Sequence, residues 1–345
     1  MVEAKYWKTS EDGRIACELC PQACLIPEGG RGICQGRVNE NGTLYAANYG
    51  QCVSVAIDPI EKKPLYHYCP GMPVLSVACN GCNLRCDFCQ NWQISQERAR
   101  TSALLPDDLV RLAVENGSFG IAYTYTEPMV WFEYLLDAGA RAHGAGLKNI
   151  LVTNGIINDE PLRELLPLVD AMNVDLKSMR DEFYTRNCHV RGGLEAVKRT
   201  IVTAAAHGGA SDGDRGDGHR VHLEVTNLLI TGENDSEDDV RELVGFIAGV
   251  DPAIPLHLSR YFPTYKMANP PTSEGSLRRA YDIAREKLHS VYVGNVGREF
   301  ATDTVCPDCG HTLITRSGYT TKVTGVNDGE CANCGRTTDV VWPDR

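Results

Sequence analysis

The feature that most constrains the fold of this chain is the alternation of short apolar runs with helical patterns across residues 71–300. Parallel strands need helical crossovers, because the chain must return to the same end of the sheet before each new strand. The pattern therefore predicts an α/β fold built on a parallel sheet. The expected strands are 73–79, 120–128, 147–155, 171–178, 220–230 and 254–263.

Three intervening segments carry helix signals. Residues 105–117 have acidic residues in the first predicted turn and Gly117 at the end, while Ser236 can cap a helix over 236–249. Residues 129–144 have apolar positions that suit a third helix. Six strand–helix units indicate a full or partial barrel, in which the chemistry gathers at the carboxyl ends of the strands. No G-x-G-x-x-G motif follows the first strand, which weakens a dinucleotide-binding interpretation.

The 15 cysteines fall into groups that divide the chain into three parts. We expect an N-terminal extension at 1–70, a barrel at 71–300 and a C-terminal module at 301–345. In the reducing cytosol, grouped cysteines indicate metal binding or catalysis rather than disulfides. Three isolated cysteines are interpreted as small buried hydrophobic residues, namely Cys52, Cys69 and Cys188.

Composition limits the classes of function. The net charge of −11 gives no overall positive field that would attract nucleic acid. No apolar run approaches the length of a membrane-spanning helix, and the charged N-terminal segment lacks the apolar core of a signal peptide. We therefore expect a cytoplasmic protein with neither a nucleic-acid partner nor a membrane partner.

The segment CNLRCDFC directly follows the first predicted strand and contains Cys82, Cys86 and Cys89. Thiolates in a short loop suit zinc or an iron–sulfur cluster. Three thiolates leave one iron of a four-iron cluster open to an outside ligand. Alternatively, Cys79 is the fourth ligand of a zinc ion or of a cluster.

This loop, with aromatic Phe88 before its last cysteine, resembles the cluster loop of the radical S-adenosylmethionine (SAM) enzymes. The resemblance implies a partial (β/α)6 TIM-like barrel and a [4Fe-4S] cluster held by Cys82, Cys86 and Cys89. It also implies that the open iron binds the amino and carboxylate groups of SAM. One electron from the cluster then cleaves SAM to a 5′-deoxyadenosyl radical, which abstracts hydrogen from the substrate.

Later strand ends resemble those of pyruvate formate-lyase activating enzymes: YTYTEP (123–128), VTNG (152–155) and NVDLKS (173–178). The resemblance implies that Glu127 holds the SAM ammonium group. The family has two glycines before this Glu-Pro pair, and this chain has Tyr125 and Thr126 instead, so only half of that element matches.

The same resemblance places Asn154, Asp175 and Lys177 near SAM. A zwitterionic sulfonium ligand needs carboxylates for its cationic parts and donors for its carboxylate. The alternative for each residue is a helix cap or a surface ion pair. His257 and Arg260, at the end of the sixth predicted strand, are interpreted as contacts to the ribose or the substrate.

The two ends of the chain each supply four further cysteines. In the N-terminal group, four ligands close a metal shell, so the group predicts a structural site for zinc or a second cluster. The C-terminal group consists of two C-x2-C pairs, which predict a zinc ribbon. The groups are Cys17, Cys20, Cys24 and Cys34, and Cys306, Cys309, Cys331 and Cys334.

Nearly the whole chain resembles one subgroup of the activating-enzyme-like class, the radical SAM component of the AmmeMemoRadiSam system. This implies hydrogen abstraction from a carbon, as at a glycine Cα, of a protein or peptide substrate, with a one-electron donor such as flavodoxin or ferredoxin. One alternative is C-methylation of a protein residue with cobalamin, although no Asp-x-His-x-x-Gly element is present. A third hypothesis is a non-catalytic, zinc-stabilised binding module. The resemblance rests on residues 17–24, 58–71, 82–95, 257–267, 292–297 and the tail cysteines.

Overall fold

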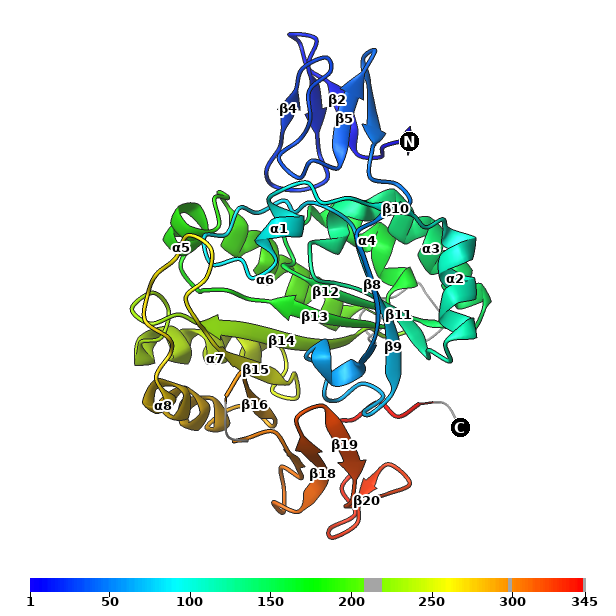
Figure 1. The fold of residues 1–345 in the computed structure, drawn as a ribbon. Helices are drawn as coiled ribbons and strands as arrows, with labels where there is room; N and C mark the ends of the chain where they lie inside the picture. The colour runs from blue at the N-terminus through cyan, green and yellow to red at the C-terminus, as the bar shows by residue number, and fades with distance from the viewer. Residues whose placement is uncertain (208–218, 297–299, 344–345) are drawn as a thin grey trace.

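The computed structural model describes residues 1–207, 219–296 and 300–343. Its centre is an eight-stranded sheet in the order β16-β15-β14-β13-β12-β11-β9-β8 (Figure 1). Strand β8 (Ser54–Pro59) pairs antiparallel with β9 (Pro73–Ala78), and all other neighbouring pairs are parallel. The remaining strands are β11 (Gly120–Tyr123), β12 (Lys148–Thr153), β13 (Ala171–Asp175), β14 (His222–Leu229), β15 (Leu256–Arg260) and β16 (Val291–Gly294).

All six predicted strands lie in this sheet, which confirms the predicted α/β barrel fold. Within the described residues, no pairing joins the edge strands β8 and β16, so the barrel is partial. Strand β16 adds a parallel strand that sequence analysis did not count, because a run of four residues is too short to show a period. Strand β8 lies inside the expected N-terminal extension, so the sheet begins before residue 71.

Helices connect the parallel strands and cover the outer face of the sheet (Figure 1). Helix α2 begins with Pro106 at a first-turn position and ends before Gly117, whose φ is +62°. The Ser236 hydroxyl caps α7 by accepting the Asp239 N–H at 3.2 Å. The helices are α1 (Trp92–Ser95), α2 (Pro106–Glu115), α3 (Phe132–Gly144), α4 (Asp159–Leu165), α5 (Asp181–Asn187), α6 (Gly193–Ala206), α7 (Glu237–Val250) and α8 (Glu274–Arg285), with 3₁₀ turns at Ile60–Lys62, Pro128–Trp131 and Leu166–Leu168.

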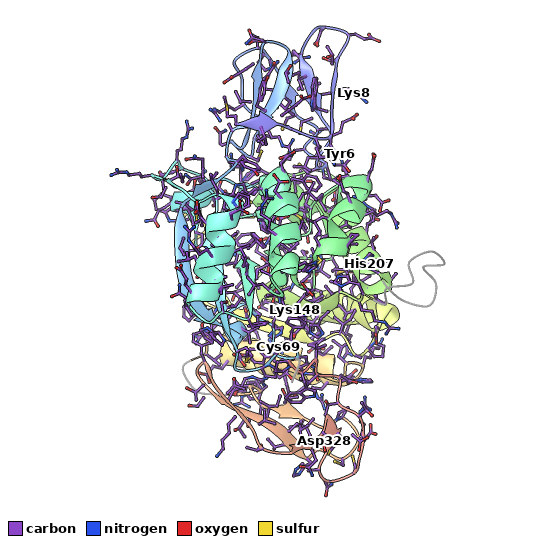
Figure 2. All side chains as sticks on the ribbon, turned by 90° about the vertical axis from the view of Figure 1, so that its right-hand side faces the viewer. Tyr6, Lys8, Cys69, Lys148, His207 and Asp328 are labelled. Carbon is purple, nitrogen blue, oxygen red and sulfur yellow. The ribbon has the colours of Figure 1, made fainter. Side chains whose placement is uncertain are left out.

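The N-terminal residues form two small sheets at one end of the barrel, where Tyr6 and Lys8 are labelled (Figure 2). Arg37 joins them to α3 through a buried ion pair with Glu133 at 2.9 Å. The ring of Tyr6 packs edge-on against Phe132 of the same helix. The strands are β1 (Val2–Glu3), β2 (Trp7–Thr9), β3 (Ile15–Cys17), β4 (Leu25–Ile26), β5 (Arg37–Glu40) and β6 (Thr43–Ala46); β7 (Gln51–Cys52) pairs separately with β10 (Ser102–Ala103).

The C-terminal residues pack against the opposite end of the barrel (Figure 1). The Val341 N–H donates to the His67 carbonyl at 2.7 Å, and the Val341 carbonyl accepts the Cys69 N–H at 2.8 Å. Cys69 accordingly lies at the boundary between barrel and tail, above Asp328 (Figure 2). The tail strands are β17 (Thr304–Val305), β18 (Thr312–Ser317), β19 (Thr320–Val323), β20 (Val326–Asn327) and β21 (Glu330–Cys331).

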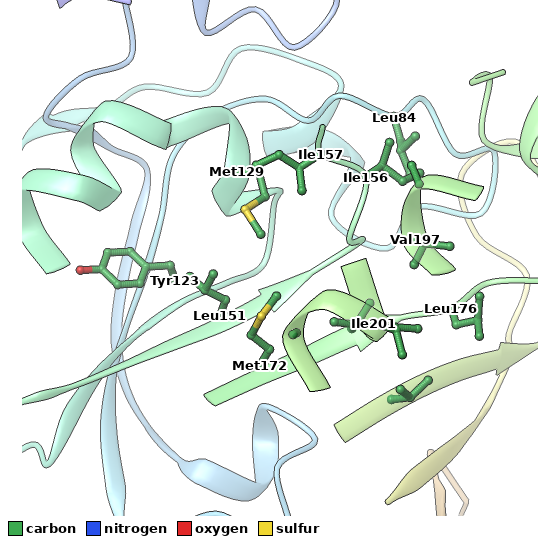
Figure 3. Packing of buried hydrophobic residues seen from close by; sticks show 14 of the residues in the cluster. Leu84, Tyr123, Met129, Leu151, Ile156, Ile157, Met172, Leu176, Val197 and Ile201 are labelled. Carbon is green, nitrogen blue, oxygen red and sulfur yellow. The ribbon is translucent and has the colours of Figure 1, made fainter. Parts of the chain in front are cut away.

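Buried apolar side chains between the sheet and its helices form the main core. Leu151 and Met172 come from neighbouring strands, and Ile201 comes from α6 (Figure 3). Leu84, from the cysteine loop, joins the same core near Ile156. The loop is therefore anchored to the barrel by apolar burial between two of its cysteines.

Candidate active site

The three loop cysteines lie at the carboxyl end of β9. The Leu84 N–H donates to the Cys82 sulfur at 3.3 Å, and the Asn154 side-chain amide lies 3.6 Å from the same sulfur. The Cys89 sulfur lies 3.1 Å from the Ser95 hydroxyl. Donors directed at sulfur stabilise thiolates, which are the metal-binding form of cysteine.

Burial opposes ionisation of these thiols in the metal-free chain. Desolvation, together with the nearby Glu127 charge, holds the pKa of Cys82 well above its ordinary value. The pKa of Cys86 is also held well above its ordinary value, first by an interaction with Cys188 and then by desolvation. Desolvation raises the pKa of Cys89. Metal binding must therefore supply the positive charge that deprotonates the loop.

The spacing of the three thiols fits a cluster better than a single ion. In the described part of the chain, only the tail cysteines form a set of three or more potential ligands whose atoms all lie within 4.8 Å of one another. Tetrahedral zinc with Zn–S bonds of about 2.3 Å holds its sulfurs about 3.8 Å apart. In a four-iron cluster each thiolate binds a different iron, so the three loop sulfurs need not be within 4.8 Å of one another.

Glu127 follows β11 and faces the end of β12. Its Oε1 accepts the Thr153 hydroxyl at 2.6 Å and the Met129 N–H at 3.0 Å, and its Oε2 accepts the Asn154 N–H at 2.8 Å. Complete burial raises the pKa of Glu127 to about 7, although these hydrogen bonds lower it. A cation bound beside Glu127 would therefore favour its ionised form.

Asn154 connects the β12 end to the cysteine loop. Its side-chain amide donates to Asn83 Oδ1 at 2.8 Å, next to the contact with Cys82, and its own oxygen accepts the Ile156 N–H at 2.9 Å. The predicted proximity of Asn154 to the loop is therefore present in the structure.

Asp175 and Lys177 occupy the end of β13. The Lys177 ammonium lies 3.0 Å from Asp175 Oδ2 and 6.0 Å from the centre of the Phe88 ring. Burial lowers the pKa of Lys177, but Asp175, Cys86 and Cys188 outweigh burial and hold it well above its ordinary value. The structure thus brings the β13 pair beside the cysteine loop.

His257 and Arg260 have other partners. His257 Nε2 lies 2.6 Å from Glu224, which also accepts the backbone N–H groups of Tyr66 and His67. Arg260 donates from Nε to the Thr272 carbonyl at 2.8 Å. In the described residues, no hydrogen bond or ion pair joins either side chain to the cysteine loop, so their role as ribose or substrate contacts stays a prediction.

Sequence analysis missed the position of Cys188. Its fully buried thiol interacts with Cys86, and its carbonyl accepts the Arg85 N–H at 3.1 Å. Cys79, considered as a fourth ligand, has a pKa raised by desolvation and further by the charges of Cys34, Glu127 and Cys52, while a hydrogen bond with Thr126 lowers it. No spacing pattern in the sequence connects Cys188 to the loop, because it lies on a different connection of the barrel.

The tail cysteines form a compact tetrad. Cys306 and Cys334 have sulfurs 3.6 Å apart, and those of Cys309 and Cys331 are 3.7 Å apart. This spacing matches four thiolates around one tetrahedral ion. Gly310 and Gly335, which follow the two pairs, have φ values of +71° and +76°, as tight metal knuckles require.

Comparison with known proteins agrees with this arrangement. The profile of the Radical SAM superfamily matches residues 76–247. The uncharacterized protein MJ0808 of Methanocaldococcus jannaschii is 40% identical over 349 residues, which cover 99% of this chain and 100% of the relative. The chain belongs to the radical SAM superfamily.

Two solved structures align with part of this chain. A domain of pyruvate-formate lyase-activating enzyme from Bacteroides vulgatus has a TM-score of 0.42 and 21% identity, covering 51% of this chain and 99% of that domain. SuiB of Streptococcus suis, bound to the precursor peptide SuiA, has a TM-score of 0.48 and 16% identity, covering 69% of this chain and 52% of SuiB.

None of the helices in the described part of this radical SAM protein has the length and apolarity needed to span a bilayer.

Proposed function

We propose that this radical SAM protein is an enzyme that abstracts hydrogen from a carbon atom, in the leading case a Cα, of a protein or peptide substrate. The observation that carries the proposal is the gathering of Glu127, Asn154 and the Asp175–Lys177 pair around the three-cysteine loop. When bound, the [4Fe-4S] cluster and SAM supply a 5′-deoxyadenosyl radical, with the electron provided by a donor such as flavodoxin or ferredoxin.

Different residues of the chain would hold the cluster and SAM. Cys82, Cys86 and Cys89 supply three thiolates and leave the fourth ligand position to SAM. The Glu127 carboxylate receives the SAM ammonium group, which neutralises a buried charge. Asn154 fixes the loop by its contacts to Cys82 and Asn83.

A polypeptide substrate is supported by aromatic residues beside the loop. Tyr265 stacks on Trp92 of α1 with ring centres 5.2 Å apart. Phe262 and Tyr265 are 44% and 37% exposed. The Lys266 N–H donates to the Asp87 carbonyl at 2.9 Å, which attaches this aromatic segment to the cysteine loop. Exposed aromatic side chains are typical of surfaces that bind polypeptides.

The test follows deuterium from the substrate into 5′-deoxyadenosine. Anaerobically reconstituted protein is incubated with SAM, a reductant and extract from cells grown in deuterated medium, after ultrafiltration has separated macromolecules from small molecules. We expect deuterated 5′-deoxyadenosine with the macromolecular fraction and none with Cys86→Ala. Deuterium from the small-molecule fraction alone would contradict a protein substrate, and no product above the variant would contradict catalysis.

Methylation is distinguished by the same reaction. A cobalamin-dependent methyltransferase would purify with a corrinoid spectrum after growth with cobalamin, and it would form S-adenosylhomocysteine and a methylated protein. Hydrogen abstraction without methyl transfer predicts neither S-adenosylhomocysteine nor a methylated protein. For the tail tetrad we propose zinc, in a module that stabilises the chain or docks a partner.

A further inference from the structure

The four N-terminal cysteines form a site that the proposed reaction does not use. Cys17, Cys20, Cys24 and Cys34 line a single cavity. Asn83, which follows the catalytic Cys82, lines the same cavity. We propose that these four cysteines hold a second four-iron cluster, which passes electrons to the catalytic cluster.

The first argument is the spacing of the thiols. No three of these four sulfurs lie within 4.8 Å of one another, whereas all four tail sulfurs do. The chain therefore contains one tetrad arranged for a single ion and another that is wider. A cluster spreads its thiolates over four irons, so the N-terminal tetrad shares the wide geometry of the catalytic loop.

The second argument is a buried donor without a partner. Arg37 is fully buried and lines the cavity. Its Nη1 donates to the Lys5 carbonyl and its Nη2 pairs with Glu133, both at 2.9 Å. Its Nε has no hydrogen-bond partner among the described residues. Leaving a buried N–H unpaired is unfavourable.

An iron–sulfur cluster would satisfy that donor. A four-iron cluster with four thiolates is anionic, and its sulfurs accept hydrogen bonds. The Arg37 guanidinium offers both a positive charge and the free N–H. The Ile33 N–H, 3.5 Å from the Cys24 sulfur, is a second donor of the same kind.

The third argument is the contact with the catalytic loop. Gln22 donates to the Asn83 carbonyl at 2.7 Å, and Arg85 donates to the Ile33 carbonyl. The other end of Asn83 approaches Cys82, whose sulfur lies 3.8 Å from Asn83 Oδ1. One residue therefore separates the two cysteine sites, which is a short path for an electron.

The resulting step is a one-electron transfer. A donor protein carrying a flavin or an iron–sulfur cluster reduces the N-terminal cluster by one electron. That cluster is reoxidised as the catalytic cluster gains the electron, and no bond forms or breaks in the transfer.

Metal counts of the full-length protein test the cluster. With one zinc in the tail, we expect about eight irons and one zinc per chain, against about four irons and two zincs if the N-terminal site binds zinc. The triple variant Cys82→Ala, Cys86→Ala, Cys89→Ala should keep about four irons. If that variant holds no iron while wild type holds two zincs, the proposal is wrong, whatever the outcome of the 5′-deoxyadenosine assay.

The electron path has its own test. The variant Cys20→Ala, Cys24→Ala should lose at least tenfold more of its 5′-deoxyadenosine-forming rate with reduced flavodoxin or ferredoxin than with a strong chemical reductant, because only the protein donor needs the relay. Equal rates with the protein donor would refute the relay.

Electron spin relaxation tests whether the two clusters are close together. Relaxation in the reduced wild type should be faster than in the triple loop variant or the Cys20/Cys24 variant, because two nearby paramagnetic clusters interact. Unchanged relaxation would contradict the proximity of the two clusters. Unchanged tail zinc serves as the check that the variants fold.

Discussion

A Cβ atom placed on Gly81 would lie only 2.1 Å from the carbonyl oxygen of Cys34. Gly81 has a φ of +98° and directly precedes Cys82 of the three-cysteine loop, while Cys34 is the last of the N-terminal cysteines. The two backbones can touch because glycine has no side chain, and this contact places the N-terminal cysteine segment against the three-cysteine loop.

Gly81→Ala should therefore damage both cysteine sites. The added methyl group meets backbone and cannot be relieved by a rotamer change, so the two segments must separate. We expect the reconstituted variant to lose at least half of its iron. Gly13→Ala is the matched control, since Gly13 also has a positive φ, +78°, but nothing lies within 4 Å of its Cβ position. Equal iron in the two variants would contradict the importance of the contact.

The adjacent thiols of Cys86 and Cys188 should differ in their effect on the cluster. Cys86→Ala removes a ligand and should abolish the catalytic cluster, lowering iron by about four atoms per chain. Cys188→Ala should retain that iron, because the proposed site leaves its fourth position to SAM. Iron analysis and the absorbance of the cluster measure both effects. If Cys188→Ala also lost the cluster, Cys188 would be a ligand and the SAM position would be closed.

SAM affinity should depend on pH through Glu127. Its pKa of about 7 means that the carboxyl group is half protonated near neutral pH before SAM binds. A bound ammonium group favours the ionised form, so affinity should fall as pH drops below about 7, by up to tenfold per pH unit. Calorimetry between pH 6 and 8 measures this.

Glu127→Gln should bind SAM more weakly at pH 8 and show a flatter pH profile. The exposed Glu242→Gln substitution makes the same chemical change away from the site and should leave affinity unchanged. An unaltered pH profile in Glu127→Gln would assign the titration to another group.

Arg316 should control the attachment of the tail. Its buried guanidinium donates to the Tyr66 carbonyl and the Thr304 hydroxyl, both at 2.8 Å, and lies 3.9 Å from Glu61. Arg316→Met leaves the Glu61 charge buried without this partner. We expect a loss of about 3–5 kcal/mol in the free energy of unfolding and rapid proteolysis of the tail.

The control for Arg316 is the exposed pair of Arg241 and Glu286. Their side chains are 50% and 55% exposed, so Arg241→Met should change stability by less than about 1 kcal/mol. Denaturant titration and limited proteolysis compare the two variants; a similar response in both would show that Arg316 does not secure the tail.

The strands and the strand-end residues were predictable from sequence for one physical reason. The long parallel strands are largely buried and rich in apolar or β-branched residues, and parallel strands end on the same edge of the sheet. That argument pointed to the residues that follow each strand, and the resemblance to activating-enzyme strand ends singled out Glu127, Asn154 and Asp175 among them. It could not find the four-residue strand β16, whose pattern is too short.

Contacts that depend on loop conformation were not predictable. Cys188 reaches Cys86 only through the path that the chain takes after α5. His257 lies at a strand end as expected, but its side chain pairs with Glu224, which also binds the backbone at residues 66–67. Neither partnership has a periodic signal, since each is set by how distant segments pack.

The attachment of the tail to residues 66–69 also bears on when this protein can mature during synthesis. His67 and Asp339 are joined although 272 residues separate them. During synthesis, residues 66–69 therefore leave the ribosome well before the tail segment that packs against them. Contacts between segments so far apart in the sequence form slowly. An oxygen-sensitive cofactor inserted before the tail has been synthesised would be exposed to solvent. We therefore expect cofactor loading to follow the packing of the tail against residues 66–69.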